Sequence, residues 1–324
     1  MNTATTPDKA DPRGWLPGFL LLGVIWGSSF LFIKVGVAEL HPLYVTLGRV
    51  LAGVLTLLVV IAATRDRLPR DLRLWGHLTV TGVVGTAMPF TLFGYGEERV
   101  SSSLAGIWNA TTALLVLPLA VYLFRTERMT VNRAVGLVIG FLGVLVVLGV
   151  WEGLGGAQFT GQLMCIAAAA CYAVAIPYTK RFISDSGESG LALAAGQLIT
   201  ATVALAIVAP LTVGAPTPLG DLSGKAIASI LALGAVGTGL AFVLNMRNIQ
   251  IVGATTASMV TYLIPIFAVV LGVLALDEHI TWHQPVGALI VLVGVAVAQG
   301  LIASRKRPRP AAVAPEAELA AERA

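Results

Sequence analysis

The sequence predicts an all-α polytopic membrane protein with ten transmembrane helices, arranged as two inverted five-helix repeats. Three observations predict it: the composition, the placement of the basic residues and an internal repeat. Hydrophobic residues make up 56% of the 324 residues and charged residues 12%, and the mean hydropathy is +0.86. Soluble domains carry about a quarter charged residues, and a water-soluble core could not hide this much apolar surface. The composition therefore excludes a soluble enzyme and favours a chain solvated by lipid.

The apolar stretches are the expected membrane spans, because a spanning helix needs about 20 mostly apolar residues. Ten such stretches cover residues 15–37, 43–63, 75–95, 102–124, 134–150, 161–180, 190–213, 226–246, 254–276 and 284–303. The first is longer than the apolar core of a signal peptide and carries Lys34 near its end, so we expect it to be retained as a span. The loops between the stretches are too short for a sizeable soluble domain.

The basic residues decide the orientation. If the N-terminus lies in the cytoplasm and the stretches alternate in direction, all but four of the Lys and Arg residues fall in cytoplasmic regions. Those four are Lys34, Arg49, Arg99 and Lys225. Basic residues accumulate in cytoplasmic loops, so we expect a multi-pass protein of the cytoplasmic (inner) membrane with both termini in the cytoplasm. The net charge of +4 then reflects topology, and we expect no nucleic-acid partner.

The two halves of the chain contain collinear matching motifs. The segment Thr126–Thr130 recurs as Asp277–Thr281. Further matches are Gly82–Thr86 with Gly234–Thr238, Gly48-Arg49 with Gly196-Gln197, Trp26 with Tyr172, and Lys34 with Lys180. These matches predict two homologous repeats of five spans. Because five is odd, the second repeat must cross the membrane in the opposite orientation, which is typical of secondary transporters with a central site. A duplicated, inert helical scaffold is the alternative.

The repeats set the expected domain organisation. We expect the first five-helix repeat over residues 15–150 and the second over 161–303, with an extracytoplasmic linker at 151–160. The polar segment 1–14 and the basic segment 304–324 are expected to be disordered cytoplasmic tails.

Several motifs resemble those of the drug/metabolite transporter superfamily, EamA type. They are Trp26–Ser29 with Lys34, Arg49, a Glu-x-x-Thr-x₅-Gly-x₆-Gly pattern beginning at Glu127 and again at Glu278, and Pro265 at the family's span-nine proline position. The first half departs from this pattern, because Leu114 stands at the matching place and Pro118 lies one turn later. The resemblance covers nearly everything except the tails. It implies alternating-access export or exchange of a small solute such as an amino acid, a nucleoside or an amphiphilic metabolite.

Polar and aromatic side chains on the apolar stretches are the candidate substrate-binding residues, because a ligand pocket combines apolar walls with a few hydrogen-bonding groups. The candidates are Trp26, Ser29, Arg49, Tyr95, Trp108, Asn109, Thr112, Tyr172, Tyr178, Asn245 and Tyr262. For each, hydrogen bonding between helices, core filling or a place in an aromatic belt is the alternative. No metal-ligand or cofactor motif occurs, so we expect no cofactor. The lipid bilayer and a small-molecule substrate are the expected partners, and monomer and dimer both stay open.

Arg49 lies about two turns below the outer start of the second stretch. Ionisable residues at membrane depth are costly and are functional candidates by default. Two interpretations stay open: a structural role, in which Arg49 pairs with Glu97, Glu98 or backbone carbonyls, or an anchor for an anionic group of the substrate. The acidic residues lie at the ends of the stretches. We therefore expect facilitated exchange, or ion coupling through an outer acid such as Glu97 or Glu98.

Two other classes of protein compete with a transporter. Gly187–Gly190 has the Gly-x-Ser-Gly form of an intramembrane serine protease, which needs a histidine close to Ser189. The expected topology places His279 and His283 on the other side of the membrane, so this motif is expected to be accidental. A non-transporting membrane receptor or scaffold is the second alternative, and a transport assay separates it from a carrier.

Overall fold

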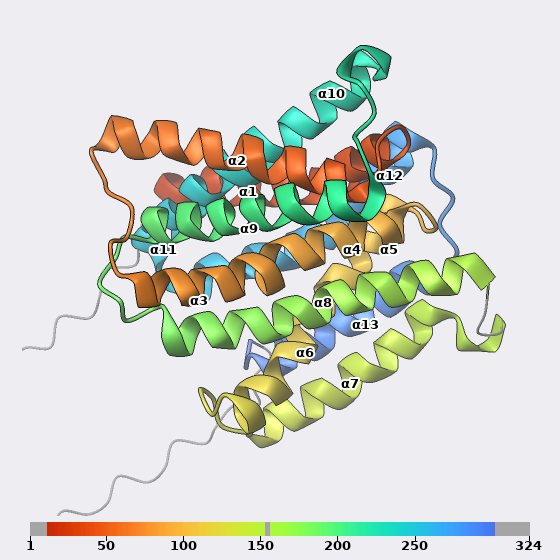
Figure 1. Ribbon diagram of the computed structural model, residues 1–324. Coiled ribbons are helices and arrows are strands. Elements are labelled where there is room, and N and C mark those ends of the chain that lie inside the picture. The colour runs from red at the N-terminus through yellow and green to blue at the C-terminus, as the bar shows by residue number, and fades with distance from the viewer. Residues whose placement is uncertain (1–11, 153–155, 302–324) are drawn as a thin grey trace, which may run out of the picture.

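The computed structural model describes residues 12–152 and 156–301, and these residues form helices and connecting loops without strands. The expected tails, apart from residues 12–14, and the centre of the expected linker lie outside these ranges. Within the described residues, nine helices are long and apolar enough to cross a membrane, and Figure 1 shows them running side by side with a shorter apolar helix, α13. The protein is therefore an all-α polytopic membrane protein.

The first half contains five helical rods. They are α1 (Pro12–Val37), α2 (Pro42–Thr64), α3 (Leu72–Gly82) continued by η1 (Val83–Ala87) and α4 (Met88–Glu97), α5 (Ser102–Ala110) continued by α6 (Thr112–Pro118) and η2 (Leu119–Leu123), and α7 (Val131–Leu148). The rods bend or loosen where the sequence provides glycine or proline. The segment η1, for example, is π-helical and follows Gly82.

The second half repeats this order. Its rods are α8 (Gly156–Phe182), α9 (Gly190–Val213), α10 (Gly224–Leu231) continued by η5 (Ala232–Leu240) and α11 (Ala241–Ser258), η6 (Met259–Tyr262) continued by α12 (Leu263–Leu276), and α13 (His283–Ala298). The tenth predicted stretch, 284–303, is thus only partly helical. The π-helical segment η5 contains Gly234–Thr238, the counterpart of Gly82–Thr86. Both repeats therefore carry a π-helical segment at matched places, and such segments occur often at functional sites.

The loops separate into two ends of the bundle. Loops 65–71, 124–130 and 183–189 lie at the left of Figure 1. The first two carry Arg65, Arg67, Arg70, Arg125 and Arg128, and we call this end the basic end. Loops 38–41, 98–101, 214–223 and 277–282 lie at the right of Figure 1, which we call the opposite end.

Helix contacts in one half have counterparts in the other. Helix α2 contacts η5, and α9 contacts η1 in the same way; α1 contacts α12, and α8 contacts α6. The pairs α2–α9 and α7–α13 each join an element to its own counterpart, and the contact of α5 with α12 joins the matching rods α5–α6–η2 and η6–α12. Exchanging the two halves therefore reproduces the contact pattern, as expected for a pseudo-two-fold arrangement of inverted repeats.

Glycines allow α7 and α13 to pack closely at the edge of the bundle (Figure 1). A Cβ atom on Gly294 would lie 2.4 Å from the backbone nitrogen of Gly140, and one on Gly136 would lie 2.4 Å from the carbonyl oxygen of Gly294. Small residues permit this approach, and van der Waals packing then holds the helices together in lipid.

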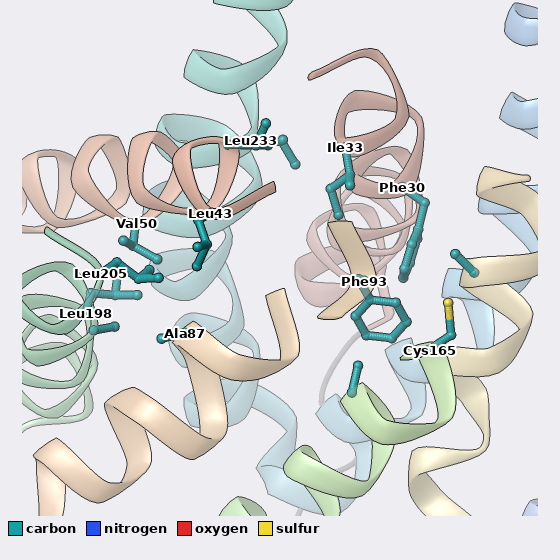
Figure 2. Packing of buried hydrophobic residues seen from close by; sticks show 14 of the residues in the cluster. Phe30, Ile33, Leu43, Val50, Ala87, Phe93, Cys165, Leu198, Leu205 and Leu233 are labelled. Carbon is teal, nitrogen blue, oxygen red and sulfur yellow. The ribbon is translucent and has the colours of Figure 1, made fainter. Parts of the chain in front are cut away.

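The main hydrophobic core joins both halves (Figure 2). Val50 of α2 lies near Leu198 and Leu205 of α9. A second group contains Phe30 and Phe93, whose rings meet edge to face with centroids 5.4 Å apart. The central helices of the two repeats are thereby held around the space described next.

Candidate functional site

A cavity of about 590 Å³ lies between the two halves. Its lining combines aromatic and aliphatic walls with a few polar groups, the usual composition of a small-molecule site. The α1, α2, η1–α4 and α5–α6 segments contribute from the first half, and α8, α9, η5–α11 and η6–α12 contribute from the second. The lining continues to Gln299, directly after α13, so the cavity reaches towards the basic end.

Most of the candidate residues from the sequence meet at this cavity. Those that line it are Trp26, Ser29, Arg49, Asn109, Thr112, Tyr172, Asn245 and Tyr262. Trp26 and Tyr172, the matched residues of the two repeats, both belong to this lining. Figure 2 shows Phe30 and Phe93, which belong to the same wall, beside one another.

Three candidates lie elsewhere. Trp108 is fully buried in the hydrophobic core and is not part of the cavity lining. Tyr95 lies towards the opposite end, where its hydroxyl is 3.4 Å from His41 Nε2. Tyr178 lies towards the basic end, where its hydroxyl is 2.7 Å from His77 Nδ1. The expected aromatic wall therefore forms without Trp108.

Arg49 is held on the cavity wall by the other half of the protein. The residue is 7% exposed, and its Nε donates a hydrogen bond to Thr238 Oγ1 at 3.1 Å. The Thr238 hydroxyl donates in turn to the carbonyl of Leu233, 2.9 Å away. The guanidinium carbon lies 3.6 Å from the centroid of the Phe90 ring, a cation–π contact. Gly234 permits this geometry, because a Cβ atom there would lie 2.5 Å from the Arg49 carbonyl oxygen.

The pairing of Arg49 with Glu97 or Glu98 is wrong. In the described part of the chain, Glu98 pairs with Arg99 at 3.0 Å, and no ion pair reaches Arg49. Helix α2 packs against η5 of the second half, so the nearest polar partner comes from there.

A second polar pair is the repeat counterpart of the pair Arg49–Thr238. Gln197 Nε2 donates a hydrogen bond to Thr86 Oγ1 at 2.8 Å, and both residues line the cavity. Gln197 is the counterpart of Arg49, and Thr86 is the counterpart of Thr238. The sequence analysis did not select Gln197, Thr86 or Thr238, although the repeat matches contain all three. Their signal was therefore present in the alignment of the two halves.

The opposite end is held by charged side chains that bind the backbone. Lys34 Nζ donates to the carbonyl oxygens of Glu97 and Val100, the latter at 2.8 Å. The carboxylate of Glu278 accepts from the backbone nitrogens of Ser102 and Ser103 at 2.6 and 3.0 Å. These contacts fix the turn between α4 and α5.

The basic end is held by ion pairs between side chains. Glu127 accepts from Lys180 at 2.5 Å and from Arg133 at 2.8 Å. The hydrogen bond from Lys180, with that from Arg133, lowers the pKa of Glu127 below its ordinary value, although partial burial acts in the other direction. Arg181 donates to the carbonyl of Phe124 at 2.6 Å.

Comparison with known proteins identifies the family. The model of the EamA-like transporter family matches the chain twice, over residues 13–149 and 159–299. The chain belongs to the EamA-like transporter family.

Relatives of this EamA-like chain carry transporter names. It is 24% identical over 282 residues to the uncharacterized transporter YoaV of Bacillus subtilis, a match that covers 86% of this chain and 94% of the relative. It is 25% identical over 292 residues to a protein of Escherichia coli named probable amino-acid metabolite efflux pump, covering 86% and 92% of the two chains. A solved crystal structure with 19% identity has the same fold, with a TM-score of 0.64, and covers 91% of this chain and 100% of that one.

The serine motif of the EamA-like chain has a structural role. The Ser189 hydroxyl begins α9 by accepting from the backbone nitrogen of Ala192 at 3.0 Å, and it donates to Asp66 at 2.5 Å. His279 follows α12 at the opposite end of the bundle. Within the described residues the hydrogen-bond partners of the Ser189 hydroxyl include no histidine, so the motif lacks the serine–histidine contact of a protease nucleophile.

Proposed function

We propose that this protein is a secondary transporter that exports a small metabolite or amphiphilic solute across the cytoplasmic membrane by alternating access. The observation that carries the proposal is the central cavity with two matched polar pairs, Arg49–Thr238 and Gln197–Thr86, each of which joins the two repeats. A site on the pseudo-symmetry axis can be exposed to either side when the inverted halves exchange conformations. The family membership supports a transporter, and the efflux-pump name of one relative supports export.

The proposed motion uses the repeats 15–150 and 161–303 as the two inverted units, joined by 151–160. The basic end faces the cytoplasm in this proposal, because basic residues accumulate on that side. The cavity, whose lining reaches Gln299, would then be loaded from the cytoplasm. Contacts at the opposite end would break as those at the basic end tighten, releasing the solute outside.

The decisive experiment is flux in proteoliposomes that contain the purified full-length chain. A panel of radiolabelled amino acids, nucleosides and amphiphilic acids and amines is loaded inside, and solute-dependent counterflow is measured against protein-free liposomes. Saturable counterflow of at least one class is expected. If the reconstituted, folded protein gives no counterflow for the whole panel, the receptor or scaffold alternative replaces the transporter.

Topology is tested separately with single cysteines in a background without Cys165 and Cys171. Cysteines at positions 68 and 308 should react with a membrane-impermeant maleimide only from the cytoplasm, and one at position 155 only from outside. Cytoplasmic labelling of position 155 would give the first half an even number of spans and would contradict the inverted repeat.

Energy coupling is proposed to be facilitated exchange, or to use Glu97. Glu97 is fully buried and its carboxylate has no hydrogen bond within the described residues, whereas Glu98 is exposed and paired with Arg99. The charges that act on Glu97 are those of Lys34, Glu278 and Arg49. If transport is proton-driven, Glu97→Gln should abolish the effect of a pH gradient on the flux. Glu98→Gln should leave that effect unchanged. A proton-driven flux that survives the double replacement excludes both acids.

A further inference from the structure

We infer that the transported solute is an organic anion, with a carboxylate bound by Arg49 and an aromatic or branched apolar body. This inference rests on the proposed function, because it names the chemical class that the central cavity takes. It is carried by the hydrogen-bonding state of Arg49 and by the composition of the surrounding wall.

The first step is the incomplete hydrogen bonding of Arg49. An arginine presents five N–H donors in a planar fork, and only the Nε donor has a partner, Thr238. The terminal nitrogens have no hydrogen-bond partner within the described residues, although the residue is only 7% exposed and lines the cavity. The free edge of the fork is thus available to a ligand in the cavity.

The second step is the charge balance. The described residues that line the cavity contain no Asp, Glu, Lys or His, so Arg49 is the charged member of this lining. Glu97 acts on Arg49 electrostatically, but it does not line the cavity and forms no ion pair with Arg49 within the described residues. A buried cation without a directly paired counter-ion is costly, and the Phe90 ring compensates only part of its charge. A carboxylate matches the guanidinium fork through two parallel hydrogen bonds. An anionic solute therefore completes an ion pair that the protein alone leaves half-made.

The third step concerns the rest of the solute. Around Arg49 the wall presents Trp26, Phe30, Phe93 and Tyr172. These surfaces suit a flat or branched apolar group. A solute ammonium group would meet aromatic faces and neutral amides, and no carboxylate. The cavity should therefore prefer a monocarboxylate over a zwitterion with the same body, and a zwitterion over the corresponding amine.

The matched repeat supplies the test variant. Arg49→Gln places in the first repeat the residue that stands at the counterpart position, where Gln197 bonds Thr86. The replacement can therefore keep a hydrogen bond to Thr238 while it removes the charge. Arg49→Lys keeps the charge and loses the fork. Lys225→Gln removes a positive charge from an exposed residue of α10 outside the cavity lining and serves as the matched control.

Binding is measured on the purified full-length protein by intrinsic tryptophan fluorescence and by thermal shift. The probes share one body: 3-phenylpropanoate, its neutral amide, phenylalanine and 2-phenylethylamine, with indole-3-acetate and 4-methylpentanoate as further anions. The wild type and Lys225→Gln should bind 3-phenylpropanoate at least about 10-fold more tightly than the amide, as expected for a charge-assisted pair. Arg49→Gln should abolish this ratio without lowering the melting temperature of the free protein by more than a few degrees, and Arg49→Lys should keep part of it.

The outcomes separate this inference from the proposed function. Equal binding of the acid, amide and amine, unchanged acid binding in Arg49→Gln, or no saturable binding of any anionic probe overturns the inference. If a cationic or neutral solute is transported equally well by the wild type and by Arg49→Gln, the protein is a transporter with a different substrate class, and the inference is contradicted. If the protein prefers anions through Arg49 but shows no flux, the anion site is supported and the proposal of a transporter is contradicted.

Discussion

The two ends of the bundle use the same residue types in different ways. At the basic end, Lys180 and Glu127 bind each other at 2.5 Å, with side chains 56% and 34% exposed. At the opposite end their repeat counterparts, Lys34 and Glu278, bind backbone groups on either side of the turn between α4 and α5. The ammonium of Lys34 binds the carbonyls of Glu97, the last residue of α4, and of Val100 in the turn. The carboxylate of Glu278 binds amides at the start of α5. Helix dipoles favour a cation at the end of a helix and an anion at its start.

The difference predicts which end opens more easily. Exposed ion pairs contribute about 0–1 kcal/mol each, whereas hydrogen bonds to charged groups contribute about 1.5–3 kcal/mol. The opposite end should therefore be the more costly to open. The cavity lining agrees with this ranking, since it extends to Gln299 towards the basic end. We therefore expect the conformation described to be the one that is closed at the opposite end.

Replacing Glu278 should have the largest effect on this comparison. Glu278 accepts from Ser102 N, Ser103 N and, at 2.6 Å, Ser103 Oγ. Glu278→Gln removes the charge from these bonds and should weaken closure of the opposite end by about 2–3 kcal/mol. A cysteine at position 29 should then react at least about 10-fold faster with a maleimide supplied from the opposite side.

Glu127→Gln is the control for that measurement, because it alters the matched residue at the other end. It should leave labelling of position 29 from the opposite side unchanged or slower. Equal acceleration by both replacements would show that the two ends do not differ in the proposed way.

The next largest difference is expected between the stabilities of Lys34→Met and Lys180→Met. Lys34→Met removes two hydrogen bonds to backbone carbonyls, whose cost is about 1–3 kcal/mol. Lys180→Met removes an exposed contact, for which less than about 1 kcal/mol is expected. Thermal unfolding in detergent should therefore show the larger loss of stability for Lys34→Met. A larger loss for Lys180→Met would reverse the ranking of the two ends.

The sequence predicts these ends better than it predicts the inside of the bundle. Hydropathy and basic residues locate helices and loops, since both depend on local composition. The direction in which a side chain faces depends on packing. Trp108 and Asn109 are neighbours on one apolar helix, yet Trp108 enters the core and Asn109 lines the cavity. No stripe along such a helix distinguishes lipid, core and cavity, because all three faces are apolar.

The partner of Arg49 could not be predicted for a related reason. Distance along the chain and depth in the membrane favoured the acids at the end of α4, but α2 packs against η5. Threonines on apolar helices usually bond their own backbone, so Thr238 gave no sign of a second partner. The repeat matches indicated only that positions 49 and 238 have counterparts at 197 and 86; the contacts within these two pairs come from the structure.

Acid should affect the basic end through Glu127. Its pKa is lowered by the hydrogen bonds from Lys180 and Arg133. A lowered folded-state pKa means that the contribution to stability is fully present above the ordinary value of 4.5 and is lost as the pH falls through the lowered value. At pH 7 the wild type should therefore have a slightly higher melting temperature than Glu127→Gln. The corresponding difference in the free energy of unfolding should be less than about 1 kcal/mol. The two melting temperatures should converge near pH 3, and a gap that persists there would place its origin outside this ion pair.

The smallest effect is expected for Glu39. It tests whether the cost of opening the opposite end depends on the position of an acid or on its exposure to water. Glu39 lies in the loop before α2 and accepts from the Oγ and backbone nitrogen of Ser223, at 2.6 and 2.7 Å, at the start of α10. The hydrogen bonds from the Ser223 side chain and backbone lower the pKa of Glu39, so its contribution is present above 4.5 and disappears as the pH falls through the lowered value. Glu39 resembles Glu278 in binding a helix start at the same end, but it is fully exposed to water. Glu39→Gln should therefore lower the melting temperature only slightly at pH 7 and not at all near pH 3, and it should leave the labelling of position 29 unchanged. If Glu39→Gln instead opens the opposite end as far as Glu278→Gln does, the position of the acid decides the cost. The contrast between exposed and half-buried contacts would then no longer explain why the two ends differ.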